Sequence, residues 1–155
     1  MNRIDSGFAV SFAGLLVGAG ILIGQGTQKT APRRDVGIAV QHLDAIKADQ
    51  QPWGTLRWMM NSQIDPQARQ TFGVAELRAG QRNPRHFHPN CEELLYVISG
   101  SCEHVVGARK VTLNAGDLIR IPRGVPHQAV VLGNEPVRCV VSYDSPDRQM
   151  VLQEP

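Results

Sequence analysis

The segment from residue 86 to residue 93 carries side chains whose types and spacing suit the binding of a metal ion. His86 and His88 are two residues apart, and alternate side chains of a β-strand point to one side, so both imidazoles would face the same way. A carboxylate at the start of the next strand, Glu92 or Glu93, can fold back as a third ligand. Imidazole nitrogens with one carboxylate oxygen suit Fe(II), Mn(II), Zn, Ni or Cu. A His-x-His pair is often incidental at a protein surface, so it needs support from elsewhere in the chain.

A second segment supplies a further histidine after a Pro-x-Gly turn, and together the two segments resemble the two motifs of the cupin superfamily. The first motif is Gly, five residues, His-x-His, three or four residues, Glu, six residues, Gly, and it is matched by Gly80, His86, His88, Glu93 and Gly100. The second motif is Gly, five residues, Pro-x-Gly, two residues, His, three residues, Asn, and it is matched by Gly116, Pro122, Gly124 and His127. Val131 stands in place of the final Asn, which is often absent in the family and is not a ligand.

The family spacing of three or four residues admits either of two neighbouring carboxylates. The six-residue gap to Gly100 selects Glu93. Strand alternation agrees, because it places Glu93 on the same face as Leu95 and Val97, whereas Glu92 faces the other way as a solvated or edge carboxylate. The resemblance therefore implies one divalent metal ion, Fe or Mn before Zn, Ni or Cu. Its expected ligands are His86, His88, Glu93 and His127.

Short β-type runs separated by Gly, Pro and Asn turns predict an all-β sandwich or barrel. The resemblance makes this fold a double-stranded β-helix, the jelly-roll barrel of the cupins, over residues 53–155. The predicted strands cover residues 55–60, 71–77, 93–98, 101–106, 117–121, 127–132 and 137–142.

The first 26 residues are expected to form a hydrophobic helix, which acts as a signal peptide or a single membrane anchor. No charged residue occurs from Ser6 to Gln28, and the apolar stretch has a length between those of a signal-peptide core and a membrane span. We expect export to the periplasm or the outside, or tethering to the membrane. Lys29, Arg33 and Arg34 follow the stretch, and by the positive-inside rule they favour the opposite, cytoplasm-facing orientation. Residues 27–52 read as a linker with a short strand and a helical turn.

Composition limits the choice of partners. The net charge is only +2 and no basic run with interleaved aromatic residues occurs, so nucleic acid is not an expected partner. The three cysteines, Cys91, Cys102 and Cys139, have no metal-binding or redox spacing, and their odd number leaves at least one thiol free.

The interior below the metal is expected to contain polar groups. A hairpin at Ser99-Gly100 would set Cys102 opposite Val97 and His104 opposite Leu95, and both would then face into the barrel. His104 is a candidate catalytic residue behind the ligands, acting as a general base. The alternative is that it satisfies a polar group in the wall. On the strand over 55–60, either Arg57 or Trp58 faces the metal, and alternation allows only one of them.

The resemblance implies several activities, because the fold does not choose among them. The first expectation is a small-molecule oxidoreductase of the quercetin-dioxygenase-like type, acting on a carboxylate or an enediol. The alternatives are a module that binds a small ligand or metal without turnover, and a cupin decarboxylase, lyase or isomerase. Leu94, Tyr96 and Ile98 form a second apolar face on the strand that begins at Glu93. Either the N-terminal segment or a second subunit must cover this face, and the resemblance favours a homodimer.

Overall fold

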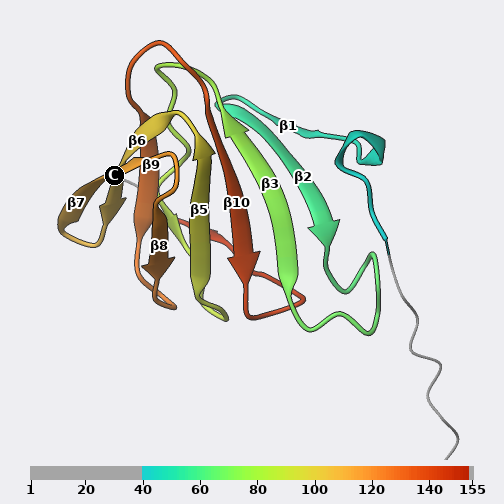
Figure 1. Cartoon of the computed structure of the whole chain (residues 1–155). Helices are drawn as coiled ribbons and strands as arrows, with labels where there is room; N and C mark the ends of the chain where they lie inside the picture. Colours follow the sequence, from blue (N-terminus) through green and yellow to red (C-terminus); the bar gives the residue numbers. More distant parts are fainter. Residues whose placement is uncertain (1–39, 154–155) are drawn as a thin grey trace, which may run out of the picture. The chain divides into compact units, whose positions relative to one another are not determined.

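The structure is a computed structural model that describes residues 40–153, and its strands form two antiparallel sheets (Figure 1). The six-stranded sheet has the order β1-β2-β3-β10-β5-β8, with β1 (Asp49–Gln51), β2 (Gly54–Met60), β3 (Thr71–Leu77), β10 (Val137–Tyr143), β5 (Glu93–Ser99) and β8 (Leu118–Ile121). The five-stranded sheet has the order β11-β4-β9-β6-β7, with β11 (Val151–Leu152), β4 (His86–Phe87), β9 (His127–Val131), β6 (Ser101–Val106) and β7 (Arg109–Asn114). The prediction of an all-β fold is confirmed.

The N-terminal predictions fall largely outside the described residues. The expected hydrophobic helix, and the signal peptide or anchor over residues 1–26, lie in the part of the chain before residue 40. Between residues 40 and 153 the structure contains one 3-10 turn, Leu43–Ala45, and no helix long and apolar enough to cross a membrane. In the leading segment the expected helical turn is present at Leu43–Ala45, and the short strand expected before it lies largely outside the described residues.

All seven strands predicted by residue range are present, with ends that differ by one residue at most, and the structure has four more, β1, β4, β7 and β11. β7 was missed because five of its six residues are exposed, so its sequence lacks the alternation of apolar and polar side chains that marks a half-buried strand. β1, β4 and β11 are two or three residues long. Of these, only β4 was expected, as the strand that carries the His-x-His pair; such short strands otherwise carry too little pattern to be recognised in a sequence.

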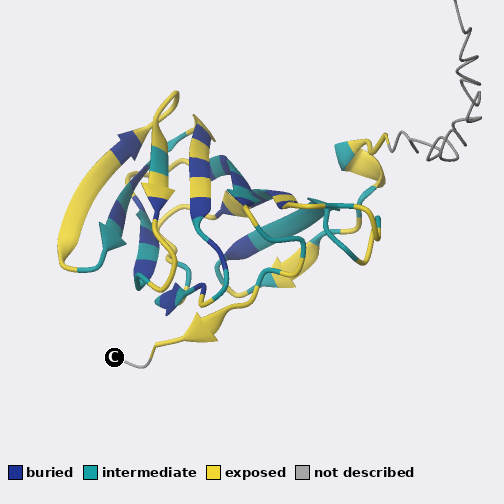
Figure 2. Cartoon of the chain, turned by 90° about the horizontal axis from the view of Figure 1, so that it is seen from below, coloured by how far each residue is buried: buried dark blue, intermediate teal, exposed yellow. Residues whose placement is uncertain are grey.

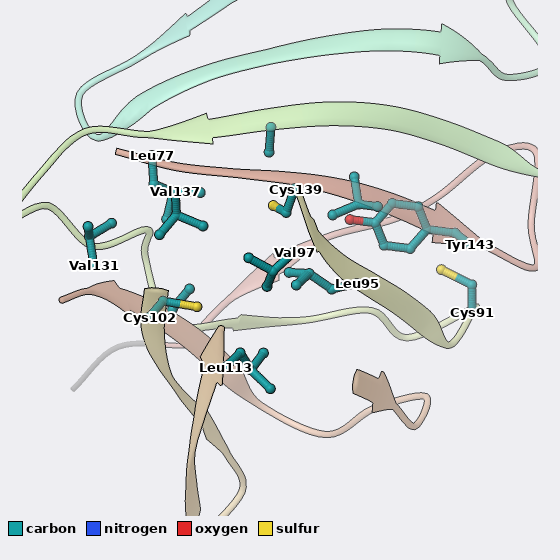
Figure 3. Close-up of a cluster of buried hydrophobic side chains, with 13 residues drawn as sticks. Leu77, Cys91, Leu95, Val97, Cys102, Leu113, Val131, Val137, Cys139 and Tyr143 are labelled. Carbon is teal, nitrogen blue, oxygen red and sulfur yellow. The ribbon is translucent and has the colours of Figure 1, made fainter. Parts of the chain in front are cut away.

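The core lies between the two sheets and is built by strict alternation along the strands. Figure 2 shows this alternation as dark blue and yellow bands. Along β5 the buried side chains that point inward are Glu93, Leu95 and Val97. Side chains of both sheets meet in the interior, as Figure 3 shows for Val97 and Cys102. Burying each large apolar side chain contributes about 1.5–3 kcal/mol to the free energy of folding. The apolar face of each strand is therefore the one that turns toward the core.

The predicted hairpin between β5 and β6 is wrong. β5 pairs with β10 and β8, whereas β6 pairs with β7 and β9, so the chain passes from one sheet to the other at Gly100. His104 consequently lies opposite Ala129 rather than Leu95, and Cys102 lies opposite Val131 rather than Val97. Both side chains are nevertheless buried as predicted, each with 1% exposure, because their facing depends on alternation along β6 and not on its partner.

Strand β2 turns Trp58 inward and Arg57 outward, which resolves the alternative that the sequence left open. Trp58 lies opposite Gly73 on β3, and its ring covers that glycine so closely that a Cβ atom there would lie 2.8 Å from the ring. Arg57 lies opposite Val74 on the outer face. Trp58 is therefore the residue that reaches the interior.

On the outer face of the six-stranded sheet, one row of apolar side chains crosses four adjacent strands. Val140 lies between Val74 and Tyr96, and Tyr96 lies opposite Leu118. Tyr96 is 43% exposed and Leu118 is 59% exposed in the single chain. The apolar face predicted on β5 is thus part of a larger apolar surface.

We expect Gly100→Ala to destabilise the protein more than Gly80→Ala. Both glycines have positive φ, 79° and 68°, and an alanine there costs about 1–2 kcal/mol in backbone strain. A Cβ atom at Gly100 would also lie 2.4 Å from the carbonyl oxygen of Pro136, whereas at Gly80 it meets nothing within 4 Å. Urea unfolding of the two variants should therefore show the larger loss at Gly100. Equal losses would contradict a steric requirement at this crossover.

Candidate metal centre

Four buried side chains that suit a metal ion converge where the two sheets meet. His86 on β4 pairs directly with His127 on β9, and His88 is the first residue after β4. Glu93 begins β5 in the other sheet. One ligand atom from each of the four residues lies within 4.8 Å of the ligand atoms of the others, and none of the four is more than 7% exposed. The structure therefore brings together all four residues that the sequence analysis selected.

Each of the three histidines is oriented by a hydrogen bond from its Nδ1 to a backbone carbonyl. The acceptors are the carbonyl oxygens of Pro84 for His86, at 2.8 Å, Gln149 for His88, at 2.6 Å, and Val125 for His127, at 2.9 Å. A carbonyl oxygen can only accept, so each Nδ1 carries the hydrogen and each Nε2 is left to bind a metal ion. Metal-binding histidines are commonly held in this way. The donor set therefore fits a divalent cation.

The charge states of the side chains also suit a cation. Burial raises the pKa of Glu93, but the close approach of His127 and His88, each with 3.1 Å between Nε2 and Oε2, lowers it well below its ordinary value. The carboxylate is therefore ionised near neutral pH. Burial, followed by the nearby His127, lowers the pKa of His86 to about 4, so this imidazole is neutral and can donate its lone pair.

Glu92 does not take part in the cluster. Its Oε2 accepts a hydrogen bond of 2.9 Å from Nε of Arg120 on the outer side of the sheet. This pairing agrees with the assignment of Glu92 as an edge carboxylate and leaves Glu93 as the inward-facing member of the pair.

A cavity of about 180 Å³ is lined by three of the four candidate ligands, His86, Glu93 and His127. Its wall combines aromatic and aliphatic side chains with a few polar groups, as is common for small-molecule sites. Its volume is below the roughly 300–1,000 Å³ of pockets that take drug-sized molecules, so it suits a compact ligand. The apolar wall includes Trp53, Leu56, Trp58, Leu95, Val141 and Tyr143, and the polar wall includes His86, Glu93, His127, His104, Asn83 and Arg148.

His104 lies in this wall with neither ring nitrogen hydrogen-bonded to any group of the described chain. It is 1% exposed and stacks on His127 with 5.9 Å between ring centroids and 19° between planes. Burial lowers its pKa to about 4, so the ring is neutral. A buried polar group without a partner costs about 1–3 kcal/mol. The structure therefore gives no support to the alternative that His104 satisfies a group in the wall, and its role in catalysis stays a prediction.

The three cysteines are free and buried. Burial raises the pKa of Cys91 to about 11, of Cys102 to about 11 and of Cys139 to about 12. Thiols with such pKa values are protonated at neutral pH and react slowly. Cys91 accordingly fills space beside Tyr143, as Figure 3 shows.

Two contributions from the C-terminal segment were missed by the sequence analysis. The carbonyl of Gln149 orients His88, and the guanidinium of Arg148 lies at the cavity wall over the ring of Trp58, 4.8 Å from its centroid. Neither belongs to a recognisable motif, and both lie more than 50 residues from the His-x-His pair. No pattern in the sequence could have placed them there.

Comparison with known proteins agrees with this geometry. Residues 73–143 match the family model described as "Cupin domain". The match covers just under half of the chain, and it shows that this part is similar to cupin domains. This finding and the fold support membership of the cupin superfamily, and they do not specify a quercetin-dioxygenase-like type.

Curated relatives match this chain over part of their length. "Polyketide synthase CurC" of Streptomyces cyaneus is 28% identical over 101 residues, covering 65% of this chain and 66% of that protein. "Germin-like protein 1-1" of Oryza sativa subsp. japonica is 31% identical over 84 residues, covering 48% of this chain and 39% of the relative. The chain thus spans less than two thirds of either relative.

Among solved structures, the oxalate decarboxylase of Lactobacillus farciminis is similar to this chain. Its TM-score is 0.67 at 23% sequence identity, over 72% of this chain and 34% of that protein. At this level of identity the similarity shows a shared fold and carries no conclusion about the reaction.

We expect the metal-free protein to lose stability as the pH falls from about 6.5 to about 5. His86 and His104 have a pKa of about 4 in the folded protein, against an ordinary value of 6.5. In this window the unfolded chain binds protons that the folded protein excludes, so the free energy of unfolding decreases by up to about 1.4 kcal/mol per pH unit for each histidine. Urea unfolding at pH 5, 6 and 7 measures this slope. His104→Phe should remove roughly half of it, and an unchanged slope would contradict the neutral state of His104.

Proposed function

We propose that the protein is a metal-dependent oxidoreductase of the dioxygenase type that acts on a small oxygen-rich molecule. One observation carries the proposal. His86, Glu93 and His127 line the same cavity as His104, whose imidazole has no partner in the described chain. A metal site that served structure alone would not need an adjoining space with an unsatisfied polar group in its wall.

The residues of the chain have distinct tasks in this proposal. His86, His88, Glu93 and His127 would hold the metal ion, which when bound supplies Lewis-acid polarisation of a substrate oxygen and, for Fe or Mn, redox chemistry. The aromatic and aliphatic wall excludes water and so strengthens the electrostatic interactions within the site. His104 would hydrogen-bond the substrate and position it beside the ligands, with either ring nitrogen available for this contact.

We propose Fe or Mn as the natural metal, with Zn, Ni and Cu compatible with the same ligands. One similar structure, an oxalate decarboxylase from Bacillus subtilis at 22% identity, is described as having Mn(II) centres. That description concerns the neighbouring protein, and it supports Mn here only as a candidate.

We expect the purified protein to contain close to one metal ion per chain. We also expect it to consume oxygen when one or more small enediol, phenolic or carboxylate compounds are added. Mass spectrometry measures the metal, and an oxygen electrode measures the uptake. His104→Phe should keep the metal and lower the rate about 100-fold, because it removes the proposed hydrogen bond to the substrate.

The neighbouring carboxylates provide a matched control. Glu93→Gln should lose the metal, whereas Glu92→Gln, which changes a residue paired with Arg120 outside the cavity, should keep both metal and activity. Bound metal without uptake or product would favour a small-ligand-binding module. Release of carbon dioxide without oxygen consumption would favour a decarboxylase, and product formation with neither would favour a lyase or isomerase.

We also propose that the protein is a homodimer, with the apolar outer face of the six-stranded sheet as its interface. This face presents the aligned side chains Val74, Val140, Tyr96 and Leu118, an apolar surface of a kind that often marks an interaction site. Tyr96→Lys should shift the sedimentation coefficient from dimer to monomer. Thr112→Lys, on exposed strand β7 of the other sheet, should leave it unchanged, and a wild-type monomer would contradict the proposal.

Localisation is proposed from the sequence alone. The uncharged stretch from Ser6 to Gln28 would direct the domain to the periplasm or the exterior, or tether it to a membrane. Recovery of the domain in the cytosolic fraction without membrane association would contradict this proposal.

A further inference from the structure

The guanidinium of Arg148 lies at the wall of the cavity without an acidic partner in the described chain. Between residues 40 and 153 no carboxylate lies within ion-pair distance of it, although Asp49 also lines the cavity. Its Nη1 is 3.5 Å from Nδ1 of His88. That nitrogen carries a hydrogen, which it donates to the carbonyl oxygen of Gln149, so it cannot accept a hydrogen bond from Arg148. The N–H groups of Arg148 therefore remain free to bind an anion.

Two aromatic rings hold this guanidinium in place. Its central carbon lies 4.8 Å from the ring centroid of Trp58 and 5.2 Å from that of Tyr143. Both rings line the cavity. Contact with aromatic rings stabilises the cation without neutralising it, and it leaves hydrogen-bond donors at the edge of the guanidinium plane.

The backbone around Arg148 is fixed to the segment that carries the metal ligands. The side-chain amide of Asn90 donates to the carbonyl of Asp147 at 2.8 Å and accepts from the amide of Gln149 at 3.0 Å. The carbonyl of Gln149 in turn accepts from His88. The position of Arg148 relative to the metal site is thus set before any ligand binds, which reduces the entropic cost of binding.

We propose that Arg148 binds the carboxylate of the substrate, which would be a small organic acid. The inference rests on the proposed function and narrows its substrate class. Arg148 contacts the ring of His88, so one end of a compact acid can bind the guanidinium while another oxygen faces the metal ligands. With a divalent ion bound, Glu93 would offset only one of the ion's two positive charges. Arg148 adds one more positive charge, so the part of the cavity between the ion and Arg148 favours an anion.

Calorimetric titration of the full chain loaded with Zn(II), which does not turn over oxygen, tests this proposal. The probes are two pairs of compounds, lactate with lactamide and benzoate with benzamide. Within each pair the acid and the amide have similar size, and only the acid is charged. The wild type should bind the acids more tightly than the amides. Arg148→Gln should weaken binding of the acids about 10–100-fold, the usual loss for hydrogen bonds to a charged group, and change binding of the amides less than twofold.

Two further variants distinguish recognition of the carboxylate from a structural role. Arg57→Gln removes an arginine next to Trp58 that faces the outside of the sheet, and it should leave all affinities unchanged. Arg148→Lys retains the charge but loses the planar group, so it should keep part of the preference for acids. If Arg148 only stabilised the fold, its replacement would lower the melting temperature and weaken acids and amides equally.

The outcomes also separate this inference from the proposed function. Equal binding of acids and amides by the wild type, including no binding of either, would overturn the role of Arg148, and so would an acid preference that survives in Arg148→Gln. Zinc bound in stoichiometric amount would leave the proposed metal site intact in those cases. If the protein binds no metal, the proposed function fails, and the same titrations of the metal-free protein still decide the role of Arg148.

Discussion

Three hydrogen bonds from imidazole Nδ1 atoms to backbone carbonyls set the geometry on which the site depends. They fix the tautomer and the ring direction of His86, His88 and His127 together, so that each Nε2 is free to bind a metal ion. Two of the acceptors, Pro84 and Val125, lie two residues before their histidine, and the third is supplied by Gln149. Local backbone turns thus orient two ligands, and the C-terminal segment orients the third.

This arrangement also accounts for the charges that the interior tolerates. A buried carboxylate is costly unless it is paired, and the Oε2 of Glu93 lies 3.1 Å from Nε2 of His88 and of His127, so a cation held among these atoms would pair with it. The two histidines that burial keeps neutral, His86 and His104, add no charge to the interior. The barrel can therefore bury an ionised ligand and several imidazoles close to an apolar core, at the cost of stability when the pH falls.

The sequence predicted the ligand set because the relevant information is local. Spacing within each motif and the two-residue period of a strand decided that His86 and His88 share a face and that Glu93, not Glu92, faces inward. The same period correctly turned Cys102 and His104 inward, even though the hairpin assumed for them was wrong. It also explains the failure on β7, whose residues are mostly exposed and carry no alternating signal.

Tertiary structure decided what lies around the ligands. Alternation permitted Arg57 or Trp58 to face the cavity, and the packing of the Trp58 ring over Gly73 selected Trp58. β5 and β6 are adjacent in the chain but belong to different sheets, because strand partners depend on how the whole chain closes around its core. Arg148 reaches the cavity for the same reason, through contacts made across more than 50 residues of sequence. Local spacing and the resemblance to the cupin motifs thus selected the four candidate ligands, whereas long-range packing determined the chemical character of the space beside them.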